Sequence, residues 1–365
     1  MIPMVNLAAL HRLIHEEVEA GMQEVMRSSQ FLDGANVAGF ENEAANYLQV
    51  RHAITCGSGT DALHLSLRAL GVGEGDEVIT TPFTFFATVE AILYTGAQVV
   101  FVDIDPQSWT LDINQLEAAI TPRTRAIIPV HLFGNPAAMP GLMALAQRHG
   151  LPVVEDCAQS FGARIDGRMT GSWGATGCFS FFPSKNLGAY GDGGMITTDS
   201  DSLADQLRKL RNHGSQERYQ HQVLGYNSRL DELQAVVLRT KLRRIEQDNE
   251  ARRTVARRYR KAFAGIKGLA MPHEAVGSVH VYNQYTVQLP QRDAMFDYLQ
   301  AREIGCAIHY PRALHQQPVL HDQFDGHSFP AAEHLARHCL SLPICSQVTD
   351  HQVDTVITAV QEALR

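Results

Sequence analysis

Short apolar segments alternate with helical patterns between about residues 52 and 156. The apolar segments are HAIT, VITT, QVVFVD, AIIPV and PVVED, and a stretch with helical spacing or a polar turn separates each from the next. This alternation is typical of a parallel sheet whose faces are covered by helices. Because the segments show little polar alternation, the strands should be buried on both faces. The chain is therefore predicted to be an α/β protein with a mostly parallel central sheet in a large domain.

The helical patterns of the first part of the chain are expected at residues 13–27, 38–48, 86–94, 113–119, 140–149 and 202–212. GCFSFF and GMITTD read as two further strands. A single long helix from Leu230 to Phe263, with apolar residues at core spacing, should leave the large domain and begin a smaller one. VHVYNQYTVQL, a helix at residues 292–302, the strand CAIHY and two C-terminal helices then predict an α+β cap. We place the domains at residues 1–240 and 241–365.

Composition excludes several classes of protein. At 365 residues and 45% apolar content the chain can bury a substantial core. Its 31 basic and 39 acidic residues leave a net charge of -8, which argues against general binding to nucleic acid or anionic membranes. The six cysteines include no CxxC pair and are expected to be buried free thiols of a reducing compartment. With no signal-peptide pattern and no apolar run of membrane-spanning length, we expect the cytoplasm.

One lysine stands in an unusual setting. Lys185 lies in SFFPSKNLGAYGDGG, between the two strands GCFSFF and GMITTD. In an apolar, glycine-rich loop, water can be excluded and the amine pKa lowered enough for the lysine to form a Schiff base. The alternative from the lysine alone is a solvated loop residue.

Two other candidate sites follow predicted strands, where ligands bind in open parallel sheets. The turn at residues 57–61, GSGTD, offers backbone N–H groups and a hydroxyl to a phosphate. It matches neither a P-loop nor GxGxxG, and by itself it is no more than a turn. Asp156 ends PVVED and could cap a helix, bind a metal or pair with a cation on a ligand.

The combination of the three is more informative than any one of them. A phosphate cradle, an acidic strand end that can hold a protonated pyridine nitrogen, and a lysine that can form an imine are the anchors that pyridoxal phosphate needs. The residues thus favour this cofactor, and no metal is expected.

Five motifs resemble one known family. They are CGSGTDALHLSLRALGVGEGDEVITTPFTFFATVEAI, GAQVVFVDID, VVEDCAQSFGA, SFFPSKNLGAYGDGGMITT and GYNSRLDELQA. The chain resembles the DegT/StrS sugar aminotransferases over nearly its whole length. The resemblance implies the fold type I architecture of pyridoxal-phosphate enzymes. Within the family, the sequence is most similar to enzymes that aminate UDP-2-acetamido-2-deoxy-3-oxo-glucuronic acid for bacterial surface polysaccharide, including the lipopolysaccharide O-antigen.

The resemblance assigns catalytic and cofactor-binding roles by position. Lys185 would hold pyridoxal 5'-phosphate as an internal aldimine and then move a proton as general base and acid. Asp156 would keep the pyridinium nitrogen protonated. Phe85 would stack on one face of the ring, where the family also uses Tyr, and Gln159 would lie against the other. The cofactor phosphate would be bound by Gly59, Thr60, Ser180 and, from a second subunit of a homodimer, Asn227.

The resemblance also points to residues for the nucleotide sugar, which are Ser29, Phe31, Ser184, Arg229, His309 and Tyr310. Arg229 can take a carboxylate or a phosphate in bidentate fashion, as a uronic acid would require. A structural pair with Asp231 or Glu232 is the alternative for Arg229. His309 stands where a core histidine is the ordinary expectation.

The expected reaction is transfer of an amino group from L-glutamate to a UDP- or dTDP-linked keto sugar, with the ketone at C3 or C4. Nucleic-acid binding by the arginine-rich helix near residues 239–261 is a rival hypothesis, but acidic residues interrupt that helix and no binding motif is present. Within the family, dehydratases carry histidine at the lysine position, and Lys185 argues against them. A member that binds the cofactor without transamination stays a further alternative.

Overall fold

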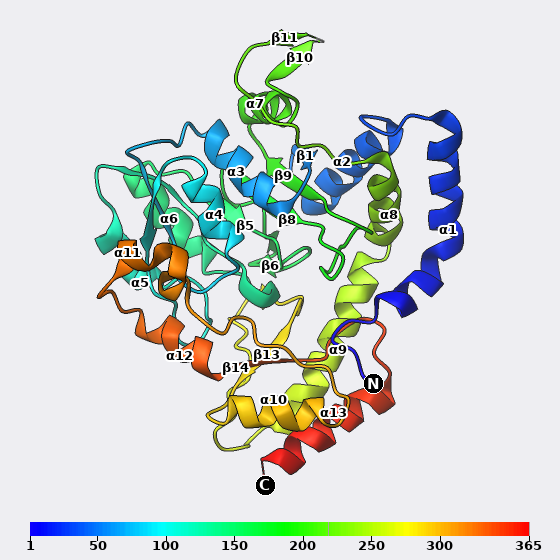
Figure 1. Ribbon diagram of the computed structural model, residues 1–365, viewed down its shortest axis with the longest axis vertical. Helices are drawn as coiled ribbons and strands as arrows, with labels where there is room; N and C mark the ends of the chain where they lie inside the picture. The colour runs from blue at the N-terminus through cyan, green and yellow to red at the C-terminus, as the bar shows by residue number, and fades with distance from the viewer. Residues whose placement is uncertain (218, 365) are drawn as a thin grey trace.

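The computed structural model describes residues 1–217 and 219–364, and seven of its strands form a central sheet within the first two hundred residues (Figure 1). In spatial order they are β3 (Gln98–Phe101), β2 (Glu77–Thr80), β4 (Thr124–Ile127), β5 (Val154–Asp156), β8 (Thr176–Ser180), β9 (Gly194–Thr198) and β1 (His52–Cys56). Parallel bridges from Ile127 to Val153 and from Val130 to Asp156 join the β3–β2–β4 group to the other four strands.

Most neighbouring strands in this assembly run parallel. β2 is parallel to β3 and β4, and β5 is parallel to β8, whereas β9 runs antiparallel to both β8 and β1. The prediction of a mostly parallel sheet is confirmed. Because parallel strands end at one edge, the chain after β1, β5 and β8 emerges on the same side of the sheet, and candidate residues distant in sequence meet there.

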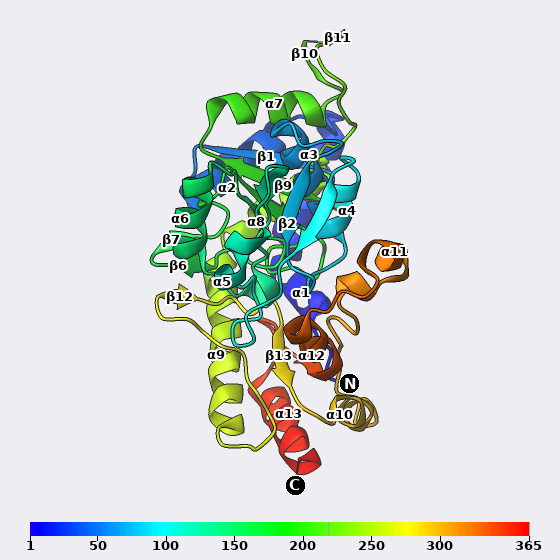
Figure 2. The ribbon, with the colours of Figure 1, turned by 90° about the vertical axis from the view of Figure 1, so that its left-hand side faces the viewer.

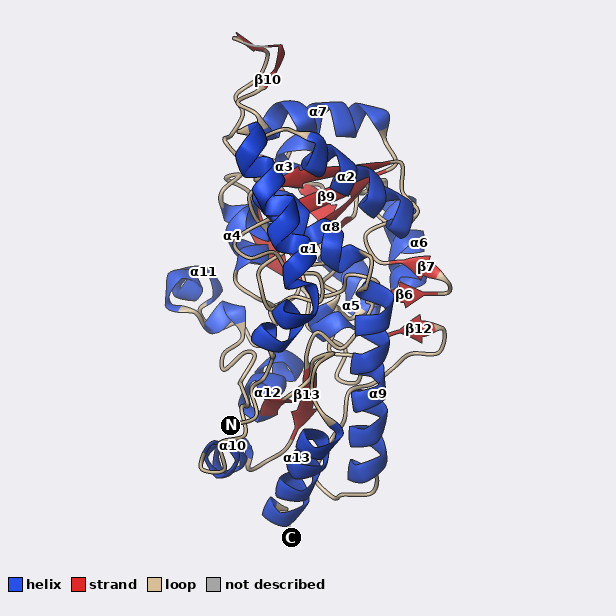
Figure 3. Cartoon of the chain, turned by 90° about the vertical axis from the view of Figure 1, so that its right-hand side faces the viewer, coloured by secondary structure: helices blue, strands red, loops and turns tan. Residues whose placement is uncertain are grey.

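Helices cover both faces of this sheet (Figures 1 and 3). Those of the first two hundred residues or so are α1 (Leu7–Ser28), α2 (Ala35–Leu48), α3 (Gly59–Ala69), α4 (Ala87–Leu93), α5 (Ile113–Leu116), η1 (Glu117–Ala119), η2 (Leu132–Gly134), α6 (Met139–His149) and α7 (Asp201–Arg211). Ser58 and Ser200 cap α3 and α7 with their side chains, and Gly150 ends α6 in the left-handed region at φ 64°. α1 begins at Leu7 rather than at Leu13.

The predicted single helix from Leu230 to Phe263 is wrong. The segment forms α8 (Glu232–Leu242) and α9 (Ile245–Phe263), with a tight turn in which the Arg244 N–H donates to the Lys241 carbonyl at 3.0 Å. α8 packs against α1 and α2, whereas α9 packs against α13 (Asp350–Ala363). The break lets each half bury its apolar face against a different core, which one straight helix would not do.

The C-terminal part has its own apolar core, to which Tyr259, Tyr285 and Leu299 contribute. Its elements include β13 (Tyr285–Gln288) and β14 (Cys339–Leu342), an antiparallel pair, with α10 (Arg292–Gln300) and α12 (Pro330–His338). The predicted strand Cys306–Tyr310 is wrong. Ala307 makes one antiparallel bridge with Ser341, and the chain then turns toward the candidate site.

Smaller elements complete the fold. They are β6 (Arg164–Ile165), β7 (Arg168–Met169), β10 (Ser215–Glu217), β11 (Gln220–His221), β12 (Ser278–Val279), η3 (Leu314–Gln316), η4 (Pro318–Leu320) and α11 (His321–Phe324). The β10–β11 hairpin projects beyond α7 (Figures 1 and 2). Residue Ile2 pairs with Ile304, so the N-terminus touches the C-terminal core and the domain boundary at residue 240 stays a prediction.

Two sequence-based expectations about composition can be compared with the structure. All six cysteines are buried and free, which confirms the prediction of buried free thiols. Within the described residues, no helix has both the length and the apolar content that crossing a bilayer requires.

Candidate active site

A cavity of about 410 Å³ lies at the carboxyl ends of the strands. Ten of the fourteen predicted site residues line it, namely Gly59, Thr60, Phe85, Asp156, Gln159, Ser180, Ser184, Lys185, His309 and Tyr310. They come from both parts of the chain, since His309 and Tyr310 belong to the C-terminal part. The tertiary structure thus brings the lysine, the strand-end aspartate and the glycine turn into one cavity.

Lys185 lies in the loop between β8 and β9 and is enclosed by the cavity walls. The loop is held from several sides. The Lys185 N–H donates to the Phe182 carbonyl at 2.9 Å, the Asn186 side chain donates to Asn249 at 2.7 Å, and Lys241 Nζ donates to the Gly188 carbonyl at 2.5 Å. Burial lowers the pKa of Lys185 to about 8, against the opposing effect of the Asp156 charge. A larger fraction of its amine is therefore neutral and nucleophilic near neutral pH than for an ordinary exposed lysine.

Asp156 ends β5 with its carboxyl group buried in the cavity wall. Its Oδ2 accepts a hydrogen bond from the Thr88 hydroxyl at 2.7 Å, and its Oδ1 accepts one from the Ala158 N–H at 3.1 Å. Burial raises the pKa of Asp156, while these two hydrogen bonds and the charge of Lys185 act in the opposite direction. A carboxylate held in this way can pair with a cationic N–H of a ligand.

The start of α3 forms an anion cradle. Ser58 accepts the N–H of Asp61 through its hydroxyl at 3.1 Å and the N–H of Ala62 through its carbonyl at 3.0 Å. Because the first N–H groups of a helix have no partner within it, those of Gly59 and Thr60 are available to an anion. A Cβ at Gly59 would lie 2.6 Å from the Cβ of Ser180, so glycine is needed for the Ser180 hydroxyl to approach this cradle.

Planar groups line the space between the cradle and Lys185. Phe85 leaves 58% of its surface exposed, an unusual fraction for a phenylalanine that lines a cavity, and its ring centroid is 6.1 Å from that of Tyr310. Gln159 accepts the Phe133 N–H at 2.6 Å and donates to the Tyr310 hydroxyl at 3.1 Å. These contacts fix the amide plane of Gln159. An aromatic face and a fixed amide suit a flat aromatic ligand.

His309 differs from the core histidine that its local sequence suggests. It lines the cavity, and its Nδ1 lies 3.2 Å from the Ser341 hydroxyl. Burial, reinforced by the charge of Lys185, lowers the pKa of His309 to about 4. The ring is therefore neutral at physiological pH and available for hydrogen bonding.

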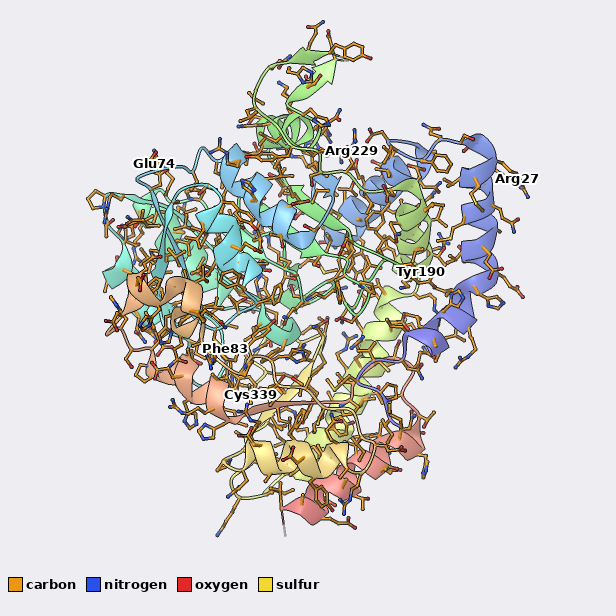
Figure 4. All side chains as sticks on the ribbon, in the orientation of Figure 1. Arg27, Glu74, Phe83, Tyr190, Arg229 and Cys339 are labelled. Atoms are coloured by element: carbon orange, nitrogen blue, oxygen red, sulfur yellow. The ribbon has the colours of Figure 1, made fainter. Side chains whose placement is uncertain are left out.

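Four predicted residues lie outside the cavity and form what we call the outer patch, which consists of Ser29, Phe31, Asn227 and Arg229. Leu32 pairs with Asp231, and the Phe31 carbonyl accepts the Glu232 N–H at 3.0 Å, so the two segments are neighbours. Figure 4 shows Arg229 close to α7 and well apart from Phe83, whose ring lies 6.0 Å from that of Tyr310.

The contacts of Arg229 differ from the structural pair considered above. Its Nη1 donates to Asn212 Oδ1 at 3.2 Å. Glu232 instead accepts the backbone N–H groups of Gly34, Asn36 and Val37, each at 2.9 Å, and so caps the start of α2. Arg229 therefore keeps part of its guanidinium free of these structural contacts and partly exposed at the surface.

Several cavity residues were missed by sequence reasoning. They are Ser58, Leu63, Thr84, Ala87, Thr88, Val130, Ala158, Phe182, Asp192, Gly193, Asn283 and Gln284. Thr88 is the second residue of α4, and a hydroxyl side chain in the first turn of a helix is the local signal for it. Asn283 and Gln284 belong to a segment that reads as a strand, and no local signal marks them.

A buried group behind β5 supports the site without facing it. The donor atoms of His131, Glu155 and Cys157 lie within 4.8 Å of one another, a spacing that a metal ion could bridge. However, His131 contacts Glu155 at 3.0 Å and accepts the Ala137 N–H at 3.0 Å, and Glu155 accepts three N–H groups of the turn at residues 171–174. Through these hydrogen bonds the group stabilises the backbone next to Asp156.

Comparison with known proteins gives concordant results. Residues 12–361 match the DegT/DnrJ/EryC1/StrS aminotransferase family. The UDP-N-acetyl-3-dehydro-alpha-D-glucosamine 3-aminotransferase of Acidithiobacillus ferrooxidans is 50% identical over 100% of this chain and 98% of its own. The UDP-2-acetamido-2-deoxy-3-oxo-D-glucuronate aminotransferase of Pseudomonas aeruginosa is 42% identical over 94% and 95%. The solved structure of Streptomyces venezuelae DesV in complex with a ketimine intermediate has a TM-score of 0.98 at 43% identity, over 100% and 98%.

Proposed function

The chain belongs to the DegT/DnrJ/EryC1/StrS aminotransferase family, and we propose that it uses pyridoxal 5'-phosphate and L-glutamate to aminate the C3 ketone of a UDP-linked 2-acetamido sugar. The observation that carries the cofactor assignment is that Lys185 and Asp156 line one cavity together with the anion cradle of α3. Family membership makes the chain a sugar aminotransferase. The sugar, donor and cofactor are the parts that we propose.

The residues present fit this cofactor. When bound, pyridoxal phosphate supplies an aldehyde for a lysine amine and a ring that accepts electrons. Gly59, Thr60 and Ser180 would hold its phosphate, and Asp156 would hold the proton on its ring nitrogen. Lys185 Nζ, with its pKa lowered to about 8, would serve first as nucleophile and then as the group that takes up and returns a proton.

The substituent at C6 of the sugar distinguishes two candidate substrates. The sequence motifs favour a uronic acid, whose carboxylate the Arg229 guanidinium can bind in bidentate fashion. The 50% identity to the glucosamine-type relative favours a neutral sugar with the same nucleotide and the same ketone position. The alternative to both candidates is a substrate with its ketone at C4 or with dTDP as its nucleotide. Supplying each purified substrate and measuring kcat/KM would decide among them.

We also infer a homodimer with shared active sites, located in the cytoplasm and serving surface polysaccharide synthesis. The outer patch supports sharing, because its four residues lie outside the cavity of their own chain and reach a sugar site only if a second copy supplies them. Mixed dimers of Lys185→Ala and Arg229→Ala test this inference. With the uronic acid as substrate, Lys185→Ala alone should be inactive and Arg229→Ala alone strongly weakened, and mixing them should restore sites of wild-type kcat/KM, whereas no recovery after confirmed subunit exchange would contradict sharing.

The visible absorption spectrum of the cofactor-supplemented protein tests the proposed function. A band from the lysine-bound cofactor should appear, and L-glutamate alone, without sugar, should convert it to the band of the aminated cofactor. The Lys185→Ala variant is the control and should lack the first band. A band that does not change when glutamate is added would favour a dehydratase or a family member that does not transaminate. The absence of any band would contradict the proposed cofactor.

A further inference from the structure

Two residues in the wall of the cavity have no assigned role, namely Asn283 and Gln284. Figure 1 shows β13, which begins directly after them, between the central strands and α10. They enter the cavity from the same part of the chain as His309 and Tyr310, whereas the cavity residues proposed to hold the cofactor all precede residue 200. This part of the wall is therefore available to the substrate.

The side-chain oxygen of Asn283 is unpaired. Only 7% of the surface of Asn283 is exposed, and its Oδ1 is buried without a hydrogen-bond partner among the described residues. Buried polar atoms in folded proteins are almost always paired, and leaving one unpaired is costly. Because Asn283 lines the cavity, a bound ligand can supply the missing donor. Gln284 Oε1 is unpaired as well, but Gln284 also borders a separate narrow cleft beside His280, so we draw the inference for Asn283 alone.

The backbone that leads to this amide is held from two sides. Arg252 is buried, and its Nη1 donates to the Tyr282 carbonyl at 3.2 Å. The side chain of Asn186, which follows Lys185, donates to the Val281 carbonyl at 2.9 Å. A side chain on a backbone fixed in this way is preorganised, so a ligand that pairs with it loses little affinity to ordering the protein.

Tyr282, the residue before Asn283, provides independent support. Its φ of 46° lies in the left-handed region, which is rare for a bulky residue. The surroundings hold this conformation, because the Tyr282 N–H donates to His280 Nδ1 at 2.8 Å, the two rings stack at 3.9 Å, and the Tyr282 hydroxyl donates to Glu274. Residues that are kept in unfavourable backbone conformations by their surroundings cluster at binding and catalytic sites. The strain next to Asn283 therefore favours a functional role for this segment.

We propose that Asn283 accepts a hydrogen bond from a neutral donor on the sugar ring and so contributes to sugar specificity. The inference rests on the proposed function. An unpaired oxygen requires a ligand group with a hydrogen to donate, which ionised carboxylates and phosphates lack. A 2-acetamido sugar offers two such donors, a ring hydroxyl and the N–H of the acetamido group.

Calorimetric titration of the holoenzyme with UDP, UDP-glucose and UDP-N-acetylglucosamine tests the proposal without turnover. The test variant is Asn283→Leu, which keeps the approximate shape of the side chain and removes its polar atoms. The variant should bind UDP as the wild type does and UDP-N-acetylglucosamine about fivefold more weakly, as expected for the loss of one hydrogen bond. A similar loss with UDP-glucose would assign the contact to a hydroxyl, whereas no loss with UDP-glucose would assign it to the acetamido N–H.

Other outcomes would overturn the proposal. Equal losses with UDP and with the UDP-sugars would place the contact on the nucleotide, and unchanged affinity for both UDP-sugars would leave Asn283 without a ligand. If neither UDP-sugar binds the wild type, this proposal fails together with the UDP part of the proposed function. The response of the wild-type cofactor band to glutamate needs no sugar and reports independently on the proposed reaction.

Thermal unfolding of the substrate-free holoenzyme shows whether the amide has a structural role instead. Asn283→Leu should not lower the Tm, because an unpaired buried oxygen does not stabilise the fold. The control is Asn249→Leu, since the Asn249 amide is also buried but donates to the Phe161 carbonyl at 3.1 Å and accepts from Asn186 at 2.7 Å. The control should lower the Tm by at least about 2 °C. A decrease of the same size in Asn283→Leu would make that amide structural and overturn the proposal.

Discussion

The Thr88 hydroxyl donates a hydrogen bond of 2.7 Å to Asp156, across 68 positions of sequence. Thr88 is fully buried, and its own oxygen lies 3.0 Å from the hydroxyl of Thr84. In this shielded position the hydrogen bond favours the ionised form of Asp156, whereas burial raises the pKa of that carboxyl group. Thr88 is thus a positioning residue for the group proposed to hold the ring nitrogen of the cofactor.

Thr88→Val should weaken catalysis while leaving the fold intact. Valine matches the shape of threonine but has no donor, so the pKa of Asp156 should rise further. A hydrogen bond to a charged group contributes about 1.5–3 kcal/mol, which predicts a loss in kcat of roughly tenfold to hundredfold. The acid limb of the pH–rate profile should move to higher pH. Thr88→Ser should restore most of the activity, and an unchanged profile in Thr88→Val would contradict this role.

Lys185→Met should stabilise the cofactor-free protein at neutral pH. The pKa of Lys185 falls from 10.5 to about 8 on folding, so its charged form destabilises the fold below pH 8 and the effect disappears as pH rises through 10.5. The charge of Lys185 thereby lowers the free energy of unfolding by about 3 kcal/mol at pH 7 and by less than about 1 kcal/mol at pH 10. Urea unfolding of both proteins at these two pH values measures it. A difference that does not change with pH would mean that Lys185 is not buried as described.

Ser228→Ala should weaken binding of the cofactor. The Ser228 hydroxyl accepts the Gly57 N–H at 2.9 Å and donates to Asp61 at 2.7 Å, so it ties the segment of Asn227 and Arg229 to the turn before α3. Losing about 1 kcal/mol of hydrogen bonding predicts a Kd for pyridoxal phosphate about fivefold higher. Titration of cofactor-free protein, followed by visible absorbance, measures it. The exposed Ser202→Ala is the control, and equal affinities in all three proteins would contradict the prediction.

Arg229→Ala should discriminate between the two candidate sugars. If Arg229 binds a C6 carboxylate, the variant should lose roughly tenfold to hundredfold in kcat/KM for the uronic acid and much less for the neutral sugar. Steady-state kinetics with both UDP-linked substrates gives the comparison, and the half reaction with glutamate serves as the internal reference. An equal loss of activity with the sugar and with glutamate would contradict the assignment of Arg229 to the sugar site.

Much of this protein is encoded in local sequence patterns. The apolar segments predict the central strands, and strand ends followed by glycine turns place Lys185, Asp156 and Gly59 at one edge of a parallel sheet. These features follow from side-chain periodicity and turn chemistry, which depend on neighbouring residues alone. The resemblance to the family then connects those positions with a cofactor and a reaction.

The remaining features depend on contacts between distant segments. Periodicity does not reveal that α8 and α9 bury their faces against different cores, so the break at Arg243 and Arg244 was missed. Nor does it show that residues 306–310 leave β14 after one bridge to line the cavity. The partner of Asp156 and the unpaired Oδ1 of Asn283 appear only once the chain is folded, because hydrogen bonding and burial are set by which segments meet in space. The sequence by itself determined the type of sheet and the chemistry at its edge, and the tertiary structure decided which side chains tune that chemistry.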